Sequence, residues 1–164
     1  KQNFESKMDL EHSLRSADTK RAHSCYNVLA TTICNPDKRL LPDDELCIGL
    51  EVAAQQIAWG VPKQLVSALQ TVSHAVQYRS DLLTMQSMEL ILTGLSQLVE
   101  QTRISSDDTV KSASDKGSIR KWAVILATKI DAGKISKDGQ EIIKDWSAVS
   151  QDKDEFAEIR NGQR

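Results

Sequence analysis

Residues 43–60 read DDELCIGLEVAAQQIAWG, and this stretch decides the fold class. Its apolar side chains recur at steps of three and four residues: Leu46, Cys47, Leu50, Ala53, Ala54, Ile57 and Ala58. That spacing gathers them on one face of an α-helix, whereas strand-like alternation is almost absent from the chain. Pro42 and the acidic triplet are typical of a helix start, and Gly60 is typical of a helix end. The stretch therefore predicts an all-α protein.

The same spacing returns outside this stretch. It predicts further helices over 3–16, from Asp18 or Thr19 to 34, from Pro62 to 78, from Ser80 or Asp81 to 102, from Ser118 to 133 and from Ser136 or Asp138 to 149, with a short turn around Phe156 and Ile159. The segment 82–102 is apolar nearly all round, which predicts the central helix, and its Gly94 indicates a close helix crossing. We predict an irregular bundle of six to seven helices around this central apolar helix. No repeat of fixed period supports a solenoid.

Length and composition predict one domain over residues 1–164. The chain has 164 residues, of which 40% are hydrophobic and 27% charged, as in ordinary globular domains. Because it begins with Lys1 rather than Met, we interpret it as excised from a longer protein. Its three cysteines are odd in number and lie on apolar faces, which favours an intracellular setting, cytoplasmic or nuclear. No apolar run approaches the roughly 18 residues of a membrane span.

Residues 104–117 interrupt the helical rhythm with small, polar and charged side chains, which predicts a mobile connection. Within it, Ser105 precedes the acidic Asp108 by three positions, a pattern that acidophilic kinases accept. A phosphate on Ser105 would be able to dock onto Arg120 and Lys121. The alternative is a flexible linker whose serines are incidental.

Sequence patterns for catalysis and metal binding are missing. The histidines and cysteines form no Cys-x-x-Cys or His-x-x-x-His pair, and no nucleophile elbow or phosphate-binding glycine loop occurs. A cysteine–histidine pair such as Cys25 and His74 would have to assemble in three dimensions, and simple packing explains a cysteine on a helix face equally well. We predict a non-enzymatic protein with no catalytic, cofactor-binding or metal-binding residues.

Charge is segregated near the C-terminus. Residues 111–137 hold seven lysines and arginines against two aspartates, and residues 138–158 hold seven acids against two lysines. The basic segment predicts a partner-binding surface made of Lys116, Arg120, Lys121 and Lys129. Neutralisation between two neighbouring helices is the simpler alternative.

These observations predict a non-catalytic protein-protein interaction module, an adaptor or scaffold that docks a partner helix or peptide through a helical groove or a charged face. Met85, Met88, Leu92 and Leu95 exceed one helix face, so some of them are candidates for lining the groove. Full burial in a central helix is the alternative for these four. A second function is nucleic-acid binding through the basic segment 111–137, although the net charge of −2 and the lack of exposed aromatic residues there do not favour it.

Overall fold

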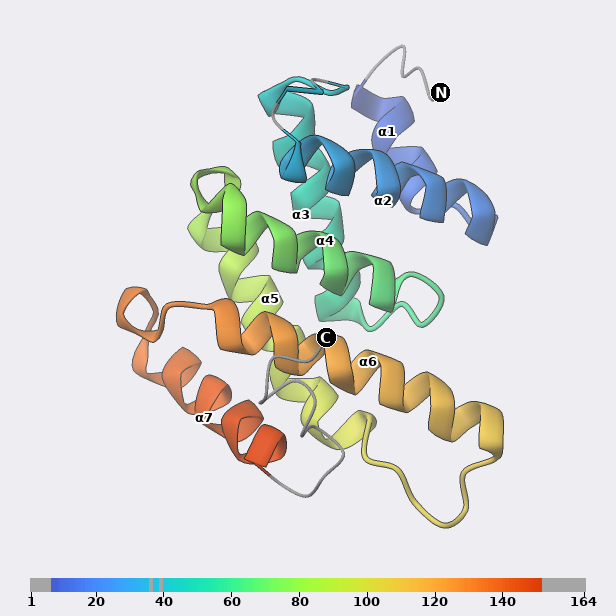
Figure 1. Cartoon of the computed structure of the whole chain (residues 1–164), viewed down its shortest axis with the longest axis vertical. Coiled ribbons are helices and arrows are strands. Elements are labelled where there is room, and N and C mark those ends of the chain that lie inside the picture. The colour runs from blue at the N-terminus through green and yellow to red at the C-terminus, as the bar shows by residue number, and fades with distance from the viewer. Residues whose placement is uncertain (1–6, 36, 39, 152–164) are drawn as a thin grey trace.

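The fold is entirely helical in the part of the chain that this computed structural model describes, residues 7–35, 37–38 and 40–151 (Figure 1). Its elements are α1 (Lys7–Leu14), α2 (Thr19–Cys34), α3 (Asp43–Trp59), α4 (Leu65–Tyr78), the 3-10 turn η1 (Ser80–Leu82), α5 (Met85–Gln101), α6 (Val110–Lys129), the 3-10 turn η2 (Ala132–Lys134) and α7 (Lys137–Gln151). No strand occurs within these residues. The all-α prediction is therefore confirmed.

The helices are stacked in two layers. Figure 1 shows α2, α4 and α6 running side by side, and α4 contacts both of its neighbours in that layer. In the second layer α1 contacts α3, α3 contacts α5, and α5 contacts α7. Successive helices thus alternate between the layers, as in helical hairpins stacked on one another.

This layering has a period that the apolar pattern does not reveal. The helices α2, α4 and α6 begin at residues 19, 65 and 110, an interval of about 45 residues, close to the roughly 40–47 residues of known helical-hairpin repeats. The predicted bundle of helices is confirmed, and its internal order is that of a stack of helical pairs. The regular interval holds for this layer alone, because α1, α3, α5 and α7 begin at residues 7, 43, 85 and 137.

The most enclosed helices are α3 and α4, rather than the predicted central segment 82–102. In the stack, α3 packs against α1, α4 and α5, while α4 packs against α2, α3 and α6. Small residues let neighbours approach α3 on several sides: a Cβ atom added to Gly49 would lie 2.6 Å from Cδ2 of Leu29. By contrast, α5 buries one face, and its Met85 is 85% exposed. Large apolar side chains therefore did not mark the centre.

Several helix boundaries follow the predicted capping residues. The Asp18 carboxylate accepts hydrogen bonds from the backbone N–H groups of Lys20 at 3.1 Å and Arg21 at 3.4 Å, which caps α2. Gly60 ends α3 in the left-handed conformation, with φ of 63°. Ser136 precedes α7, and its Oγ accepts from the N–H of Gly139 at 3.2 Å.

Two other boundaries differ from the prediction. Pro62 lies in a turn over residues 62–64, and α4 begins only at Leu65. Ser80 and Asp81 form the 3-10 turn η1, so they do not cap α5; Thr84 does, and its Oγ1 accepts from the N–H of Ser87 at 3.0 Å. The sequence did not single out Thr84 as the cap, because Ser80 and Asp81 precede it and offer the same capping chemistry.

The connection predicted over 104–117 is shorter in the structure. Helix α6 begins at Val110, where the Oγ1 of Thr109 accepts a hydrogen bond from the N–H of Ser112 at 3.0 Å, so Ser118 lies inside the helix. The polar composition of 110–117 reflects an exposed helical surface and not a loop. Mobility of the remaining loop stays a prediction, and the predicted turn around Phe156 and Ile159 lies outside the described residues. In the described part of the chain, no helix combines the length and apolar character that crossing a membrane requires.

Candidate functional site

Lys116, the first of the four predicted partner-binding cations, is engaged within the fold. Its Nζ lies 2.9 Å from Oδ1 of Asp108 and donates a hydrogen bond to the carbonyl oxygen of Arg103 at 3.3 Å. The same carboxylate accepts from the N–H of Ser105 at 2.8 Å and from the hydroxyl of Ser112 at 2.8 Å. These hydrogen bonds and the Lys116 charge hold the pKa of Asp108 well below its usual value. Lys116 therefore anchors the loop between α5 and α6.

Arg120 joins three helices. Its Nη1 donates to the carbonyl oxygen of Val99 at 3.0 Å and to Oγ1 of Thr102 at 3.1 Å, both at the C-terminal end of α5. Its guanidinium carbon also lies 5.8 Å from the centroid of the Trp146 ring on α7. The last carbonyls of a helix lack intrahelical donors, so Arg120 satisfies one that α5 leaves open.

Lys121 and Lys129 are half-buried as well. Lys129 lies within electrostatic reach of Cys34 on α2 and of His74 on α4, and burial lowers the pKa of Lys129. Burial and then the Lys129 charge lower the pKa of His74. Lys116 and Arg120 thus contact the α5 side of α6, whereas Lys129 is directed toward α2 and α4. The structure does not bring the predicted cations together on one open face.

The cysteines are packed rather than activated. Cys25 is buried, Cys34 and Cys47 are half-buried, and all three are free thiols. Burial is the largest influence on each and raises the pKa of each thiol, which keeps it protonated at neutral pH. Among the described residues, no three metal-ligating side chains gather closely enough to hold an ion.

An apolar groove of about 280 Å³ opens where the end of α4, the start of α5 and the link between α6 and α7 meet. We call it the Met85 groove. Its apolar lining consists of Val76, Leu83, Met85, Met88, Leu92, Ile130 and Ile135, and its polar lining consists of Thr84, Glu89, Asp131, Lys134 and Ser136. Met85 is 85% exposed, which makes it the most accessible of the apolar lining residues.

Local structure explains why the groove forms here. The turn η1 places Leu82 in the core and lets α5 begin with Met85 in solvent. On the opposite side, the backbone of α7 comes close: a Cβ atom added to Gly139 would lie 3.0 Å from Cδ1 of Leu92 and 3.1 Å from Cδ1 of Ile135. The glycine thus permits α7 to pack tightly beside the groove.

Four apolar residues of segment 82–102 were candidates for lining a groove. Three of these four residues, Met85, Met88 and Leu92, line the Met85 groove. The fourth, Leu95, is fully buried, and its carbonyl oxygen accepts a hydrogen bond from Nε1 of Trp146 at 2.9 Å. Sequence reasoning missed the contributions of Val76, Ile130 and Ile135, because periodicity within one helix does not indicate which ends of other elements converge on it.

A comparison with protein-family models, curated proteins and solved structures found no match to this chain.

Proposed function

We propose that this chain is a non-catalytic protein-interaction module that binds a short apolar segment of a partner, a helix or a peptide, in the Met85 groove. The observation that supports it is the exposure of Met85 beside six further apolar side chains that line the same groove. Single exposed apolar residues are common, but one that continues an apolar groove adds to a binding surface. Methionine is flexible and polarizable, so it adapts to the shape of a partner side chain.

The size and rim of the groove favour a peptide anchor over a cofactor. Its volume of about 280 Å³ lies at the lower end of the roughly 300–1,000 Å³ typical of small-molecule sites. Such a space suits one or two apolar side chains from a partner helix. Glu89, Asp131 and Lys134 supply the polar rim that protein interfaces usually have around an apolar centre.

The charged-face version of the hypothesis has less support. Lys116 and Arg120 are engaged with the loop and with α5, so they offer little to a partner. The same engagement weakens the nucleic-acid alternative, because phosphate binding needs several cations on one accessible side. Salt-sensitive gel shifts with DNA or RNA at tens of micromolar protein would restore that alternative.

We place the interaction inside the cell because the three cysteines are free thiols, as reducing compartments favour.

Peptides selected by display on the purified chain provide the test. We expect them to share two apolar residues at helical spacing and to bind Met85→Lys at least about tenfold more weakly than the parent chain. Val110→Lys is the matched control, because Val110 is 91% exposed and is absent from the groove lining. Equal binding to the parent chain, to Met85→Lys and to Met88→Lys would refute the proposal.

A further inference from the structure

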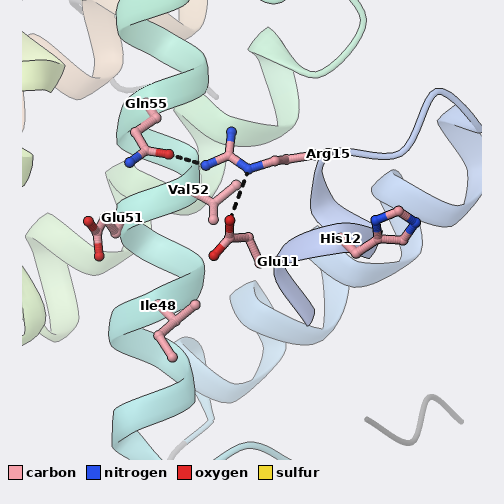
Figure 2. A pocket seen from close by; sticks show the side chains of 7 residues that line it. All are labelled: Glu11, His12, Arg15, Ile48, Glu51, Val52 and Gln55. Carbon is pink, nitrogen blue, oxygen red and sulfur yellow. Dashed lines mark hydrogen bonds and ion pairs between the residues drawn. The ribbon is translucent and has the colours of Figure 1, made fainter. Parts of the chain in front are cut away.

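A second groove, of about 450 Å³, opens between side chains of α1 and α3 (Figure 2). We call it the α1–α3 groove. It is lined by Glu11, His12 and Arg15 from α1 and by Ile48, Glu51, Val52 and Gln55 from α3. The lining is thus apolar on α3 where Ile48 and Val52 lie, with a carboxylate contributed by each helix. No residue is shared with the Met85 groove.

Arg15 is fixed within the α1–α3 groove. Its Nε lies 3.5 Å from Oε2 of Glu11, and its guanidinium donates a hydrogen bond to the side-chain carbonyl of Gln55, as the dashed lines in Figure 2 show. The guanidinium carbon also lies 5.2 Å from the centroid of the Trp59 ring. These contacts offset the positive charge of Arg15 and fix its position between the two helices.

The carboxylate of Glu51 differs from that of Glu11. Glu51 is exposed, and among the described residues no cation forms an ion pair with it. The negative charge of Glu51 therefore remains available at the rim. Glu11 is about half exposed and forms an ion pair with Arg15. Among the described residues that line the groove, two glutamates stand against one arginine, so these residues carry a net negative charge when His12 is neutral.

Trp59 lies about one helical turn beyond Gln55 on α3, next to the residues that line the groove. Ile48, Val52, Gln55 and Trp59 follow one another at steps of four, three and four residues, so they form one stripe on the helix. The Trp59 side chain is 62% exposed although Arg15 lies over its ring. Tryptophan and arginine are the residues most often found to dominate protein-protein binding. The groove and the stripe together thus offer apolar side chains, an exposed aromatic ring and a carboxylate at the rim.

From these features we propose that the α1–α3 groove binds a basic amphipathic segment of a partner protein, with lysine or arginine beside apolar residues. The aliphatic stem of a lysine would pack on the half-buried Ile48 while its ammonium group reaches Glu51. An apolar side chain one turn away would contact Trp59. The acidic rim disfavours phosphate groups, so nucleic acid does not fit this groove.

The probe is a fluorescein-labelled twelve-residue peptide of lysine and leucine at helical spacing, and its counterpart carries glutamate for lysine. Titration with the purified chain, followed by fluorescence anisotropy, should show saturable binding of the lysine peptide that weakens as salt rises. The glutamate peptide should not bind. Glu51→Lys should weaken binding of the lysine peptide about tenfold, because it replaces an attraction with a repulsion.

The matched control is Glu141→Lys, which makes the same charge change at an exposed position on α7. Trp59→Ala should also weaken binding, whereas Tyr78→Ala removes another exposed aromatic side chain and should leave it unchanged. Equal losses from Glu51→Lys and Glu141→Lys would mean non-specific attraction and would overturn the proposal, as would undetectable binding of the lysine peptide. A dimer of the chain alone that Glu51→Lys dissociates, measured by sedimentation, would assign the groove to self-association instead.

Discussion

Gly94 on α5 lies almost in backbone contact with Ile57 on α3. A Cβ atom added to Gly94 would be 2.5 Å from Cγ2 of Ile57 and 2.6 Å from its carbonyl oxygen. Helices usually pack with axes about 8–10 Å apart, and a glycine at the crossing point permits closer approach because it has no side chain. The close crossing predicted at Gly94 is thus confirmed, and it joins two neighbours in one layer of the stack.

Gly94→Ala should destabilise the fold by about 1–3 kcal/mol, because the new methyl group meets a backbone carbonyl that cannot move away cheaply. Gly117→Ala is the control: Gly117 lies inside α6 with no atom within 4 Å of an added Cβ. That control should stabilise the protein by about 0.5–1 kcal/mol, since alanine is the better helix former. Urea unfolding of the parent and both variants measures the difference. Destabilisation by both substitutions to the same extent would contradict the close crossing.

The sequence predicted the features that depend on local chemistry. Asp18 caps the start of α2 and Gly60 ends α3 as expected, because capping involves residues only two to four positions apart. Two-layer stacking was not predicted, because the contacts of α2 with α4 and of α4 with α6 join positions far apart in sequence. The helical start at Val110 was missed because exposed helical turns and loops share a polar composition.

Arg120→Ala should lower the free energy of unfolding by about 1–3 kcal/mol. The substitution leaves the carbonyl of Val99 without its charged donor at the buried end of α5, and it removes the contact with Trp146. Lys121→Ala, at the next position of the same helix, should change stability by less than about 0.5 kcal/mol. Thermal unfolding followed by circular dichroism compares the two variants. A stable Arg120→Ala protein would indicate that the guanidinium does not hold α5.

The role of Arg120 shows a limit of predicting a binding site from sequence. On sequence alone, Arg120 and Lys121 are two adjacent cations on a basic helix, and nothing distinguishes a buried role from an exposed one. In the structure Arg120 faces α5 and α7, and a partner-capture assay with Arg120→Glu would mix binding with unfolding. The groove residues on α5 were easier to predict from sequence. The apolar positions of this helix, Met85 and Met88 among them, are more numerous than one buried helix face can hold.

Acid should selectively remove the contribution of Asp108 to stability. The N–H of Ser105 and the ammonium of Lys116 lower the pKa of Asp108 well below its usual 3.8. As pH falls below about 4, the unfolded chain binds a proton at this carboxyl before the folded chain does. The stabilisation is therefore complete at neutral pH and is lost progressively below pH 4. Asp108→Asn should be less stable than the parent chain at pH 7, and this difference should shrink at pH 3.

Chemical unfolding at pH 7, 5 and 3 measures that difference, and Asp107→Asn serves as the control because Asp107 is an exposed neighbour in the same loop. The control should match the parent chain closely at every pH. A gap between the parent and Asp108→Asn that stays constant from pH 7 to pH 3 would show that the carboxylate charge does not stabilise this loop.

Ser73 on α4 is fully buried, and its Oγ has no hydrogen-bond partner among the described residues. Ser73→Ala should therefore stabilise the protein by about 1 kcal/mol, since it removes an unsatisfied hydroxyl and improves helix propensity. Thr102→Val removes a buried hydroxyl that is satisfied: Oγ1 donates to the carbonyl of Leu98 at 2.6 Å and accepts from Arg120 at 3.1 Å. That variant should lose about 1–3 kcal/mol. Opposite signs in urea unfolding are expected, and a destabilised Ser73→Ala would mean that the Ser73 hydroxyl has a partner in solution, such as a buried water.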